Sequence, residues 1–425
     1  MSPTPADPPK GGVQWRPLLV VFLTVVLDLV GFGIVIPLMT FYAEGFDASP
    51  QQVTWLMACY SIAQFFAAPL WGQVSDRYGR RPVMVVSIGL TALMLAGFAS
   101  ATSLWMLFLF RTLHGVMTAN ISTAQACVAD VTTPESRAKG MGMIGAAFGI
   151  GFTLGPVIGA VLAPPEFKAA AGMAVETTAA TLFGLPWTLA TPLWFAAGLS
   201  ALNFLLALVI FPETRRPDSV TEHRSISPTA LLAALRNPLV GLCVLLVFVQ
   251  VAAFALMEST FTLLAEHRYG FGARDVGKLF GAVGLVGIVV QGGLIGRLVR
   301  RFGERPLVPI GLALIAVGVL AMPFFPEGPA RMPLMYLDFS IVAVGQGFAS
   351  PALQGLISRA AAASEQGRIL GSAQSMSALA RAIGPAVGGL LYASISPAAP
   401  FVVAAVLLLL GVGLAFPATA RAAAA

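Results

Sequence analysis

The sequence predicts an all-α membrane protein with twelve transmembrane helices, arranged as two pseudo-symmetric six-helix halves. Three observations support this fold class: an apolar composition, a series of membrane-spanning apolar segments, and a repeated loop motif. Of the 425 residues, 57% are hydrophobic and only 10% are charged, whereas soluble proteins carry about 25% charged residues. The mean hydropathy is +0.84, so lipid is expected to surround most of the chain.

Apolar segments of sufficient length recur along the whole chain. A helix needs about 20 mostly apolar residues to cross a bilayer. Because lipid offers the backbone no hydrogen-bond partners, each segment is expected to be helical. The predicted spans are residues 17–41, 53–74, 82–101, 104–127, 140–163, 190–211, 238–264, 276–298, 306–325, 333–357, 368–391 and 398–417.

These spans divide the chain into two bundles. An N-terminal six-helix bundle is predicted over residues 17–211 and a C-terminal one over residues 238–417. A charged cytoplasmic linker, residues 212–237, joins them. The Pro-rich residues 1–16 are predicted to be a disordered cytoplasmic N-terminus, and residues 418–425 are predicted to be a C-terminal tail.

The distribution of basic residues predicts the orientation. An even number of spans places both termini on one side of the membrane, and most of the 25 Lys and Arg residues fall in the loops of that side. The positive-inside rule assigns this side to the cytoplasm. The net charge of +6 is then explained by loop Lys and Arg residues that set the orientation in the membrane. No nucleic-acid partner is expected. We expect a monomeric multi-pass protein of the plasma membrane, specifically a bacterial inner membrane, with both termini cytoplasmic and the lipid bilayer around it.

Several chemistries lack a sequence signature. The three cysteines lie in or beside apolar runs without paired or metal-ligand spacing, which predicts neither a disulfide framework nor a metal site. A Walker-type phosphate-binding motif is missing from the sequence, so ATP is not the expected energy source. We therefore expect no cofactor and no enzymatic activity.

A loop motif occurs twice. The segment Gly72–Pro82 follows the second span, and Gly296–Pro306 follows the eighth, with Gly, Arg, aromatic-Gly, Arg and Pro in register. In the first copy Asp76 and Arg80 are four residues apart, and in the second the spacing holds but the charges are exchanged. Either order allows an i, i+4 pair or a contact with a neighbouring helix end. The residues assigned to a conformational role here are Gly72, Asp76, Arg77, Gly79, Arg80, Arg81, Arg300 and Glu304.

A second repeat combines glycine with proline. The fifth span contains glycines at close spacing followed by proline, and the eleventh span repeats the Gly-Pro pair and a later glycine. Small residues allow close helix packing in lipid, and proline can kink a helix. A pivot between the halves and ordinary small-residue packing both remain open. The residues concerned are Gly151, Gly155, Pro156, Gly159, Gly384 and Pro385.

These motifs together resemble those of a known transporter family. The Gly72–Arg81 segment resembles the loop 2–3 signature of the major facilitator superfamily, and Arg111–Gly115 is similar to its fourth-helix Arg-x-x-x-Gly motif. The Gly151–Gly159 segment resembles the fifth-helix motif of twelve-helix drug:proton antiporters, and Asp28–Pro37 resembles the first helix of tetracycline-efflux transporters. The resemblance covers essentially the whole chain.

The resemblance implies a function and also shows a departure. It implies a proton-coupled secondary transporter in which the repeated loop motif acts as a cytoplasmic latch and the fifth-span motif as a seam. Tetracycline pumps resemble one another in an acidic residue of the ninth span, and residues 306–325 contain none. This difference argues against tetracycline as the substrate.

Ionisable residues inside the spans are the main candidates for chemistry, because charges in lipid are costly. Desolvation disfavours the charged form of a carboxylate, so Asp28 is expected to exchange a proton, or to pair with Arg111. An imidazole can titrate near neutral pH, so His114 either relays protons or only donates a hydrogen bond. Asp338 is expected to be hydrated near the outer end of its span, and Arg381 to be structural. The proton-coupling candidates are Asp28, Arg111, His114 and Glu258.

Residues of the seventh span suggest a substrate site. Gln250, Phe254 and Glu258 follow one another at steps of four, beside aromatic and Met side chains. A lone carboxylate in such surroundings suits an amphiphilic and often cationic ligand. For Glu258, proton coupling and a buried ion pair with Arg381 are alternatives. The substrate-binding candidates are Asp28, Gln250, Phe254, Met257, Glu258, Phe261 and Gln346.

The function predicted from these observations is export of amphiphilic small molecules or drugs in exchange for protons, by alternating access. Transport of a lipid or lysolipid, or metabolite symport, on the same fold is the alternative. A receptor or scaffold would not need carboxylates inside its spans. A membrane enzyme is not indicated, because no nucleophile motif or metal cluster unites the available Ser, His and acidic residues.

Overall fold

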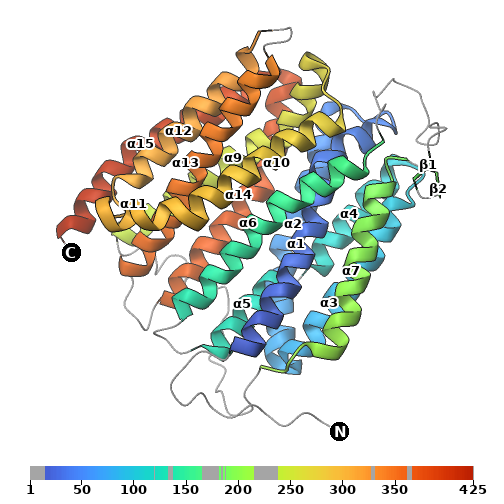
Figure 1. Cartoon of the computed structure of the whole chain (residues 1–425), viewed down its shortest axis with the longest axis horizontal. Coiled ribbons are helices and arrows are strands. Elements are labelled where there is room, and N and C mark those ends of the chain that lie inside the picture. The colour runs from blue at the N-terminus through green and yellow to red at the C-terminus, as the bar shows by residue number, and fades with distance from the viewer. Residues whose placement is uncertain are drawn as a thin grey trace. The chain divides into compact units, whose positions relative to one another are not determined.

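The chain is built almost entirely from helices in the part that the computed structural model describes (Figure 1). That part comprises residues 15–118, 120–132, 137–164, 181–182, 185–186, 188–214, 238–326, 331–360 and 366–424.

The helices of the N-terminal half are α1 (Trp15–Glu44), α2 (Pro50–Tyr78), α3 (Arg80–Ala99), α4 (Leu104–Met117), α5 (Asn120–Val131), α6 (Arg137–Leu162) and α7 (Thr191–Ile210). Between the last two, β1 (Thr181–Leu182) and β2 (Leu185–Pro186) form a short antiparallel pair, with Leu182 opposite Leu185.

The C-terminal half consists of α9 (Pro238–Tyr269), α10 (Ala273–Val289), a π-helical turn (Val290–Leu294), α11 (Ile295–Phe302), α12 (Leu307–Ala321), a 3₁₀ turn (Met322–Phe324), α13 (Arg331–Ala360), α14 (Gln366–Ser394) and α15 (Ala399–Ala424). The last helix continues through the predicted C-terminal tail up to Ala424. The predicted linker and N-terminus lie mostly outside the described residues.

Each of the twelve predicted spans coincides with a helix or with consecutive helical segments. Among the described residues, eight helices are long and apolar enough to cross a membrane alone, and the bent α2 adds a ninth. The predicted fold class, an all-α membrane protein, is confirmed. Two spans are less regular than predicted: the eighth contains the π-helical turn, and the fourth is broken between α4 and α5.

The break in the fourth span lies at Thr118, which is not helical and has φ −81° and ψ 88°. A break frees carbonyl groups that would otherwise accept hydrogen bonds from the next turn, and such groups need other donors in lipid. Trp71 of α2 donates its indole N–H to the Val116 carbonyl at 2.6 Å, and Ser87 of α3 donates its hydroxyl to the Met117 carbonyl at 2.7 Å. Side chains of two neighbouring helices therefore stabilise the break.

A capping box fixes the start of α2. The Ser49 backbone N–H donates to Oε1 of Gln52 at 2.8 Å, and the Gln52 N–H donates to Oγ of Ser49 at 3.3 Å. This reciprocal pair satisfies two backbone donors that a helix N-terminus leaves free. Pro50 occupies the first helical position, where its missing N–H carries no cost. The turn between α1 and α2 is thus encoded locally.

The chain forms two compact units. The first contains Met1–Leu38, Ala63–Pro164 and Val175–Ser225, and the second contains Met39–Ile62, Pro165–Ala174 and Ile226–Ala425. The last turns of α1 and the first turns of α2 are therefore grouped with the C-terminal helices. The bundle boundaries inferred from the sequence remain a prediction.

Each unit has its own packed interior. In the first unit, Leu18 and Val25 of α1, Ile88 of α3 and Cys127 of α5 belong to one buried apolar cluster. In the second unit, α9 packs extensively on α14 and α15, and α12 packs on α13 and α15. Side-chain contacts within these interiors position the ionisable residues considered next.

Candidate functional site

Asp28 and Arg111 are both buried in the interior of the first unit. Asp28 of α1 is 7% exposed and Arg111 of α4 is 3% exposed. The Arg111 guanidinium lies over the ring of Phe32, with Cζ 5.4 Å from the ring centroid. Phe32 follows Asp28 by one helical turn, so it lies on the same face of α1. Arg111 therefore packs against the face of α1 that carries the acidic residue.

His114 follows Arg111 by three residues and is also buried, at 4% exposed. Its carbonyl accepts two hydrogen bonds from Thr118, one from the backbone N–H at 3.0 Å and one from the hydroxyl at 2.7 Å. The helix ends at this point, so the face of α4 that carries Arg111 and His114 does not continue as one regular helix face beyond Thr118. Arg111 and His114 lie within the last two turns before the break.

Glu258 and Arg381 are electrostatic neighbours in the second unit. Glu258 lies on α9, Arg381 lies on α14, and the guanidinium of Arg381 also interacts with Tyr60. The two units therefore share a feature: the first helix of each predicted bundle carries a carboxylate, and a second helix of the unit contributes an arginine nearby. Asp28 belongs to the first unit and Glu258 to the second.

Two predicted substrate-binding residues meet in a polar contact. Gln250 of α9 is 3% exposed, and its side-chain amide donates to Oε1 of Gln346 and, at 2.7 Å, to Oγ of Ser350. Both partners lie on α13. Ser350 is a member of this polar contact that sequence reasoning did not include. Its spacing of four residues from Gln346 could have revealed it, because such residues share a helix face.

The other predicted substrate-binding residues on α9 separate into two groups, one buried and one partly exposed. Met257 is 1% exposed and Phe261 is fully buried. The Phe261 ring packs edge-on against Phe339 of α13, with centroids 4.6 Å apart, and against Phe280 of α10 at 6.2 Å. Met257 and Phe261 are thus part of the packed interior. Phe254 and Glu258 retain partial exposure, so they remain the candidates on this helix for contact with a ligand.

Asp338 is buried, although its position near a span end predicts that it is hydrated. It is 5% exposed, and its Oδ2 is buried without a hydrogen-bond partner among the described residues. Its Oδ1 lies close to α12, since a methyl group added to Gly318 would come within 3.2 Å of it. The ninth span thus has no acidic residue of its own but packs against one from the tenth.

The fifth-span glycines allow close packing of α6 on α1. A methyl group added to Gly155 would come within 2.6 Å of the Gly33 backbone, and one added to Gly159 would come within 3.0 Å of the Ile34 carbonyl. One added to Gly33 would lie 3.3 Å from Cδ of Pro156. Gly151 faces Leu29 in the same way. This seam lies within the first unit, because all of these residues belong to it.

The corresponding motif in the eleventh span forms a similar seam in the second unit. A methyl group added to Gly384 would come within 2.6 Å of Cβ of Ala255, and one added to Gly388 would come within 3.2 Å of Oγ of Ser259. Pro385 lies inside α14, as Pro156 lies inside α6. In both units the Gly-Pro helix therefore packs closely on the helix that carries the candidate carboxylate.

Arg80 is the centre of a charged network at the junction of α2 and α3. Its Nη1 lies 2.6 Å from Oδ1 of Asp76 and 2.9 Å from Oγ of Ser75, and its Nε lies 3.0 Å from Oδ2 of Asp130 on α5. Arg80 is 7% exposed. The predicted pair with Asp76 is present, and Asp130 is an additional partner that the motif alone did not indicate.

Glu213 caps the N-terminus of α3. Its two carboxylate oxygens accept the backbone N–H groups of Arg80 at 3.0 Å and Arg81 at 3.1 Å. Gly79, with φ 103°, leads into this helix. An acidic side chain at a helix N-terminus satisfies free N–H groups and interacts favourably with the helix dipole. Sequence reasoning missed Glu213, since nothing in its local sequence links it to a motif more than a hundred residues earlier.

The remaining motif residues differ in their surroundings. Arg81 donates from Nη2 to the Leu208 carbonyl of α7 at 2.7 Å. Arg77 is exposed, and its guanidinium lies 5.4 Å from the Tyr78 ring centroid. A methyl group added to Gly72 would meet nothing within 4 Å. Close packing therefore does not explain the glycine at position 72.

In the second copy of the motif the second residue of the pair is buried, as in the first copy, but it carries the opposite charge. Glu304 takes the position of Arg80 and is likewise 7% exposed, whereas Arg300 is exposed. The Glu304 carboxylate packs against α13, since a methyl group added to Gly355 would lie 2.9 Å from its Oε1. Arg300 and Glu304 thus face different surroundings, so the spacing of four does not produce the same arrangement in both copies.

Comparisons with known proteins relate the chain to membrane transporters. The sequence model of the family described as Major Facilitator Superfamily matches residues 21–385 and 292–424. The chain is 30% identical over 386 residues to the class E tetracycline resistance protein of Escherichia coli, covering 89% of this chain and 88% of that protein. It is 26% identical over 397 residues to Multidrug resistance protein 2 of Bacillus subtilis, covering 93% of each.

Among solved structures, the fold is similar to the crystal structure of the human organic anion transporter MFSD10 (TETRAN). The TM-score is 0.69 at 25% sequence identity, and the match covers 96% of this chain and 100% of that chain. The names of these proteins indicate different substrates: tetracycline, multiple drugs and organic anions. The similarity therefore supports the class of protein more strongly than any single substrate.

Proposed function

The chain belongs to the major facilitator superfamily, and on that premise we propose that it exports amphiphilic small molecules in exchange for protons by alternating access. In the orientation inferred from its Lys and Arg residues, both termini lie in the cytoplasm of a bacterial cell and the protein spans the inner membrane.

The observation that carries this proposal is the matched placement of Asp28 and Glu258. Each lies on the first helix of its bundle, and Arg111 and Arg381 are the arginines associated with them. A carboxylate inside the membrane interacts differently with a nearby arginine when it is protonated than when it is charged. Uptake of a proton can therefore favour one local arrangement over another, which is what coupling requires.

The partial exposure of Phe254 and Glu258 supports an amphiphilic cargo. Both lie on one face of α9 together with Gln250, at steps of four residues. An aromatic ring and a carboxylate on one face suit a ligand with an apolar body and a cationic group. Met257 and Phe261 do not contribute to this proposed contact, because their side chains are enclosed by the interior of the unit.

The coupling can be tested with the purified protein in liposomes that contain a pH-sensitive dye. The vesicles start with an acidic interior, and ethidium is added outside as a lipophilic cation. We expect the internal pH to rise on addition of ethidium, because protons leave as the cation enters. Asp28→Asn and Glu258→Gln should abolish this proton flux.

A matched control is Asp275→Asn on α10. Asp275 forms an exposed ion pair with Lys278 at 3.2 Å, so its neutralisation should leave the flux unchanged. Ethidium flux without any change of internal pH would contradict proton exchange and favour a uniporter or a lipid transporter. Full activity of both carboxylate variants would refute the assigned coupling residues.

Organic anions are a second candidate class of cargo, favoured by the burial of Arg111 at 3% exposed and by the position of Arg381 inside α14, where its side chain keeps partial exposure. Buried guanidinium groups are suited to carboxylate ligands. Repeating the liposome assay with fluorescein in place of ethidium distinguishes the two classes. A response to fluorescein alone would replace the cationic cargo with an anionic one and would leave the proton-coupling test unaffected.

A further inference from the structure

Glu44, Glu266 and His267 form a cluster of side chains that the predicted transport mechanism does not use. Glu44 is the last residue of α1, and the other two lie in the last turn of α9. All three belong to the second unit. The cluster lies at the C-terminal ends of α1 and α9. It is therefore separate from the mid-span residues Asp28 and Glu258.

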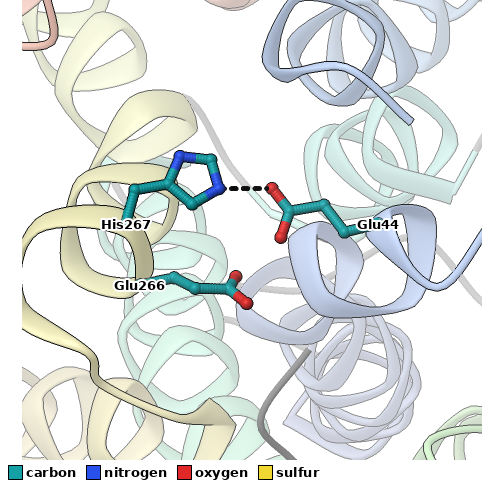
Figure 2. A group of neighbouring side chains, drawn as sticks. All are labelled: Glu44, Glu266 and His267. Carbon is teal, nitrogen blue, oxygen red and sulfur yellow. Dashed lines mark ion pairs between the residues drawn. The ribbon is translucent and has the colours of Figure 1, made fainter. Parts of the chain in front are cut away.

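The three side chains converge on one point. Figure 2 shows the side chains of His267 and Glu266, both from α9, extending toward the Glu44 carboxylate of α1. Nε2 of His267 lies 3.1 Å from Oε1 of Glu44. One ligand atom from each of the three residues lies within 4.8 Å of the other two. Glu266 and His267 are consecutive residues of α9, and consecutive residues of a helix point in different directions. Their ligand atoms come together because both side chains turn toward Glu44.

We infer that Glu44, Glu266 and His267 form a binding site for a divalent cation of the zinc class. Two carboxylate oxygens and one imidazole nitrogen are a donor set that zinc accepts in proteins. Imidazole favours zinc, cobalt and nickel ions over magnesium and calcium, which prefer oxygen ligands throughout. Water would complete the coordination, since His267 is partly open to solvent with 43% of its side chain exposed.

The spacing of the donor atoms fits such an ion. Zinc binds nitrogen and carboxylate oxygen at about 2.0–2.2 Å, so two ligand atoms of a tetrahedral site are about 3.4 Å apart. The distance of 3.1 Å between His267 and Glu44 is close to this value. A modest rotation of the Glu266 side chain would bring its oxygen to the same separation, given the limit of 4.8 Å within the cluster.

Charge and hydrogen bonding point in the same direction. The carboxylates of Glu44 and Glu266 lie side by side, and Oε2 of Glu266 is buried without a hydrogen-bond partner among the residues that the structure describes. Only 12% of the Glu44 side chain is exposed. Two adjacent carboxylates with little access to water repel each other unless a cation or a proton lies between them. A divalent ion would remove this repulsion.

Tyr392 of α14 orients the imidazole for this role. Its hydroxyl lies 3.5 Å from Nδ1 of His267. When Nε2 binds a metal ion, Nδ1 carries the proton and can donate it to a hydrogen-bond acceptor, which fixes the direction of the ring. The ring nitrogen that faces Glu44 is the one not engaged by Tyr392, so the arrangement leaves Nε2 available as a ligand.

A bound ion would join the end of α1 to the end of α9. Binding to the folded protein would therefore raise its thermal stability. The experiment uses the full chain in detergent, without a polyhistidine tag and after treatment with a chelator. Isothermal titration with Zn²⁺ should show one saturable site per chain, and Zn²⁺ should raise the melting temperature whereas Mg²⁺ at the same concentration should not.

Variants assign the site to these residues. His267→Gln and Glu44→Gln should each weaken Zn²⁺ binding at least tenfold. Tyr392→Phe should weaken it about tenfold while the absorption spectrum of bound Co²⁺ keeps the form seen in the unmodified protein. Asp275→Asn, an exposed acid on α10, should bind Zn²⁺ like the unmodified protein. Because the His267 side chain is partly exposed, its variant is expected to fold even if Glu44→Gln does not.

Three results would overturn the inference. The first is the absence of a saturable Zn²⁺ site, which would mean that the two carboxylates only share a proton. The second is unchanged Zn²⁺ affinity in His267→Gln. The third is equal stabilisation by Mg²⁺ and Zn²⁺, which would indicate an acidic patch without the imidazole ligand. None of these readouts depends on transport.

Discussion

Nη1 of Arg80 lies 2.6 Å from Oδ1 of Asp76, although the two residues belong to different helices. α2 ends at Tyr78 and α3 begins at Arg80, so the ion pair crosses the junction at Gly79. Arg80 also contacts Asp130 of α5 at 3.0 Å. The sequence left an i, i+4 pair and a contact with a neighbouring helix as alternatives, and Arg80 makes both, in a connection between three helices of the first unit.

We predict that Asp76→Asn abolishes transport and leaves the protein folded in the membrane. Arg80 would retain Asp130, so the burial of its guanidinium would still be compensated. The geometry at the junction, which we propose acts as a latch, would be lost. Proton flux in liposomes and the amount of protein in the membrane fraction measure the two outcomes separately. Full transport activity in Asp76→Asn would reject the latch.

Gly79 and Gly303 occupy equivalent positions in the two motif copies and form a matched pair for substitution by alanine. Both have positive φ, 103° for Gly79 and 76° for Gly303, so each alanine would carry backbone strain of about 1–3 kcal/mol. A methyl group at Gly79 would also come within 2.5 Å of the Glu213 carboxylate, whereas one at Gly303 would meet nothing within 4 Å.

Gly79→Ala is therefore expected to lower the melting temperature of the detergent-purified protein more than Gly303→Ala. The additional loss comes from displacement of the Glu213 cap, which contributes about 1 kcal/mol at a typical helix N-terminus. Replacing Glu213 by Gln should remove much of the difference between the two alanine variants. Equal melting temperatures for Gly79→Ala and Gly303→Ala would show that the cap contributes nothing.

Gly79 and Gly303 also illustrate which features of the fold can be predicted from the sequence. The apolar segments predicted helical structure at all twelve places where the described residues have it, because the requirement for about 20 apolar residues acts locally. The repeat revealed the equivalence of Gly79 and Gly303, and the spacing of four revealed the Asp76 pair. Asp130 and Glu213 were not found, since they reach Arg80 only through the packing of helices that are distant in sequence. The same reason hid the cluster of Glu44 with His267.

Other errors came from treating helices as regular. The fourth span was predicted to be continuous, but it breaks at Thr118, where Trp71 and Ser87 supply donors from other helices. Asp338 was expected to be hydrated because it is close to a span end, but it is buried against α12. In both cases the deciding factor is a tertiary contact that a single-helix pattern does not contain.

Phe261 is predicted to act on stability and not on ligand affinity. Its ring is fully buried between Phe280 and Phe339, so Phe261→Ala would leave a cavity and cost about 3–5 kcal/mol. Phe254→Ala, on a partly exposed side chain of the same helix, should cost less stability and weaken ethidium binding. Thermal unfolding and ethidium fluorescence titration check the two effects. A Phe261→Ala protein with unchanged melting temperature and weaker ethidium binding would restore this residue to the substrate site.

Gly155→Ala tests the seam between α1 and α6. The added methyl group would come within 2.6 Å of both Cα and the carbonyl carbon of Gly33. Backbone atoms cannot rotate away like a flexible side chain, so the two helices must separate, at a cost of about 1–3 kcal/mol. Gly198→Ala on α7 is the control, because a methyl group there meets nothing within 4 Å and alanine is the better helix former.

We therefore expect Gly155→Ala to lower the melting temperature and to reduce proton-coupled transport, while Gly198→Ala leaves both close to those of the unmodified protein. If the seam only packs the first unit, transport should fall in proportion to the amount of folded protein. If it also takes part in the conformational cycle, the transport rate per folded molecule should fall as well. The same melting temperature and transport rate in both alanine variants would mean that close approach of α6 to α1 is not required, since the helices would then tolerate the separation that the methyl group forces.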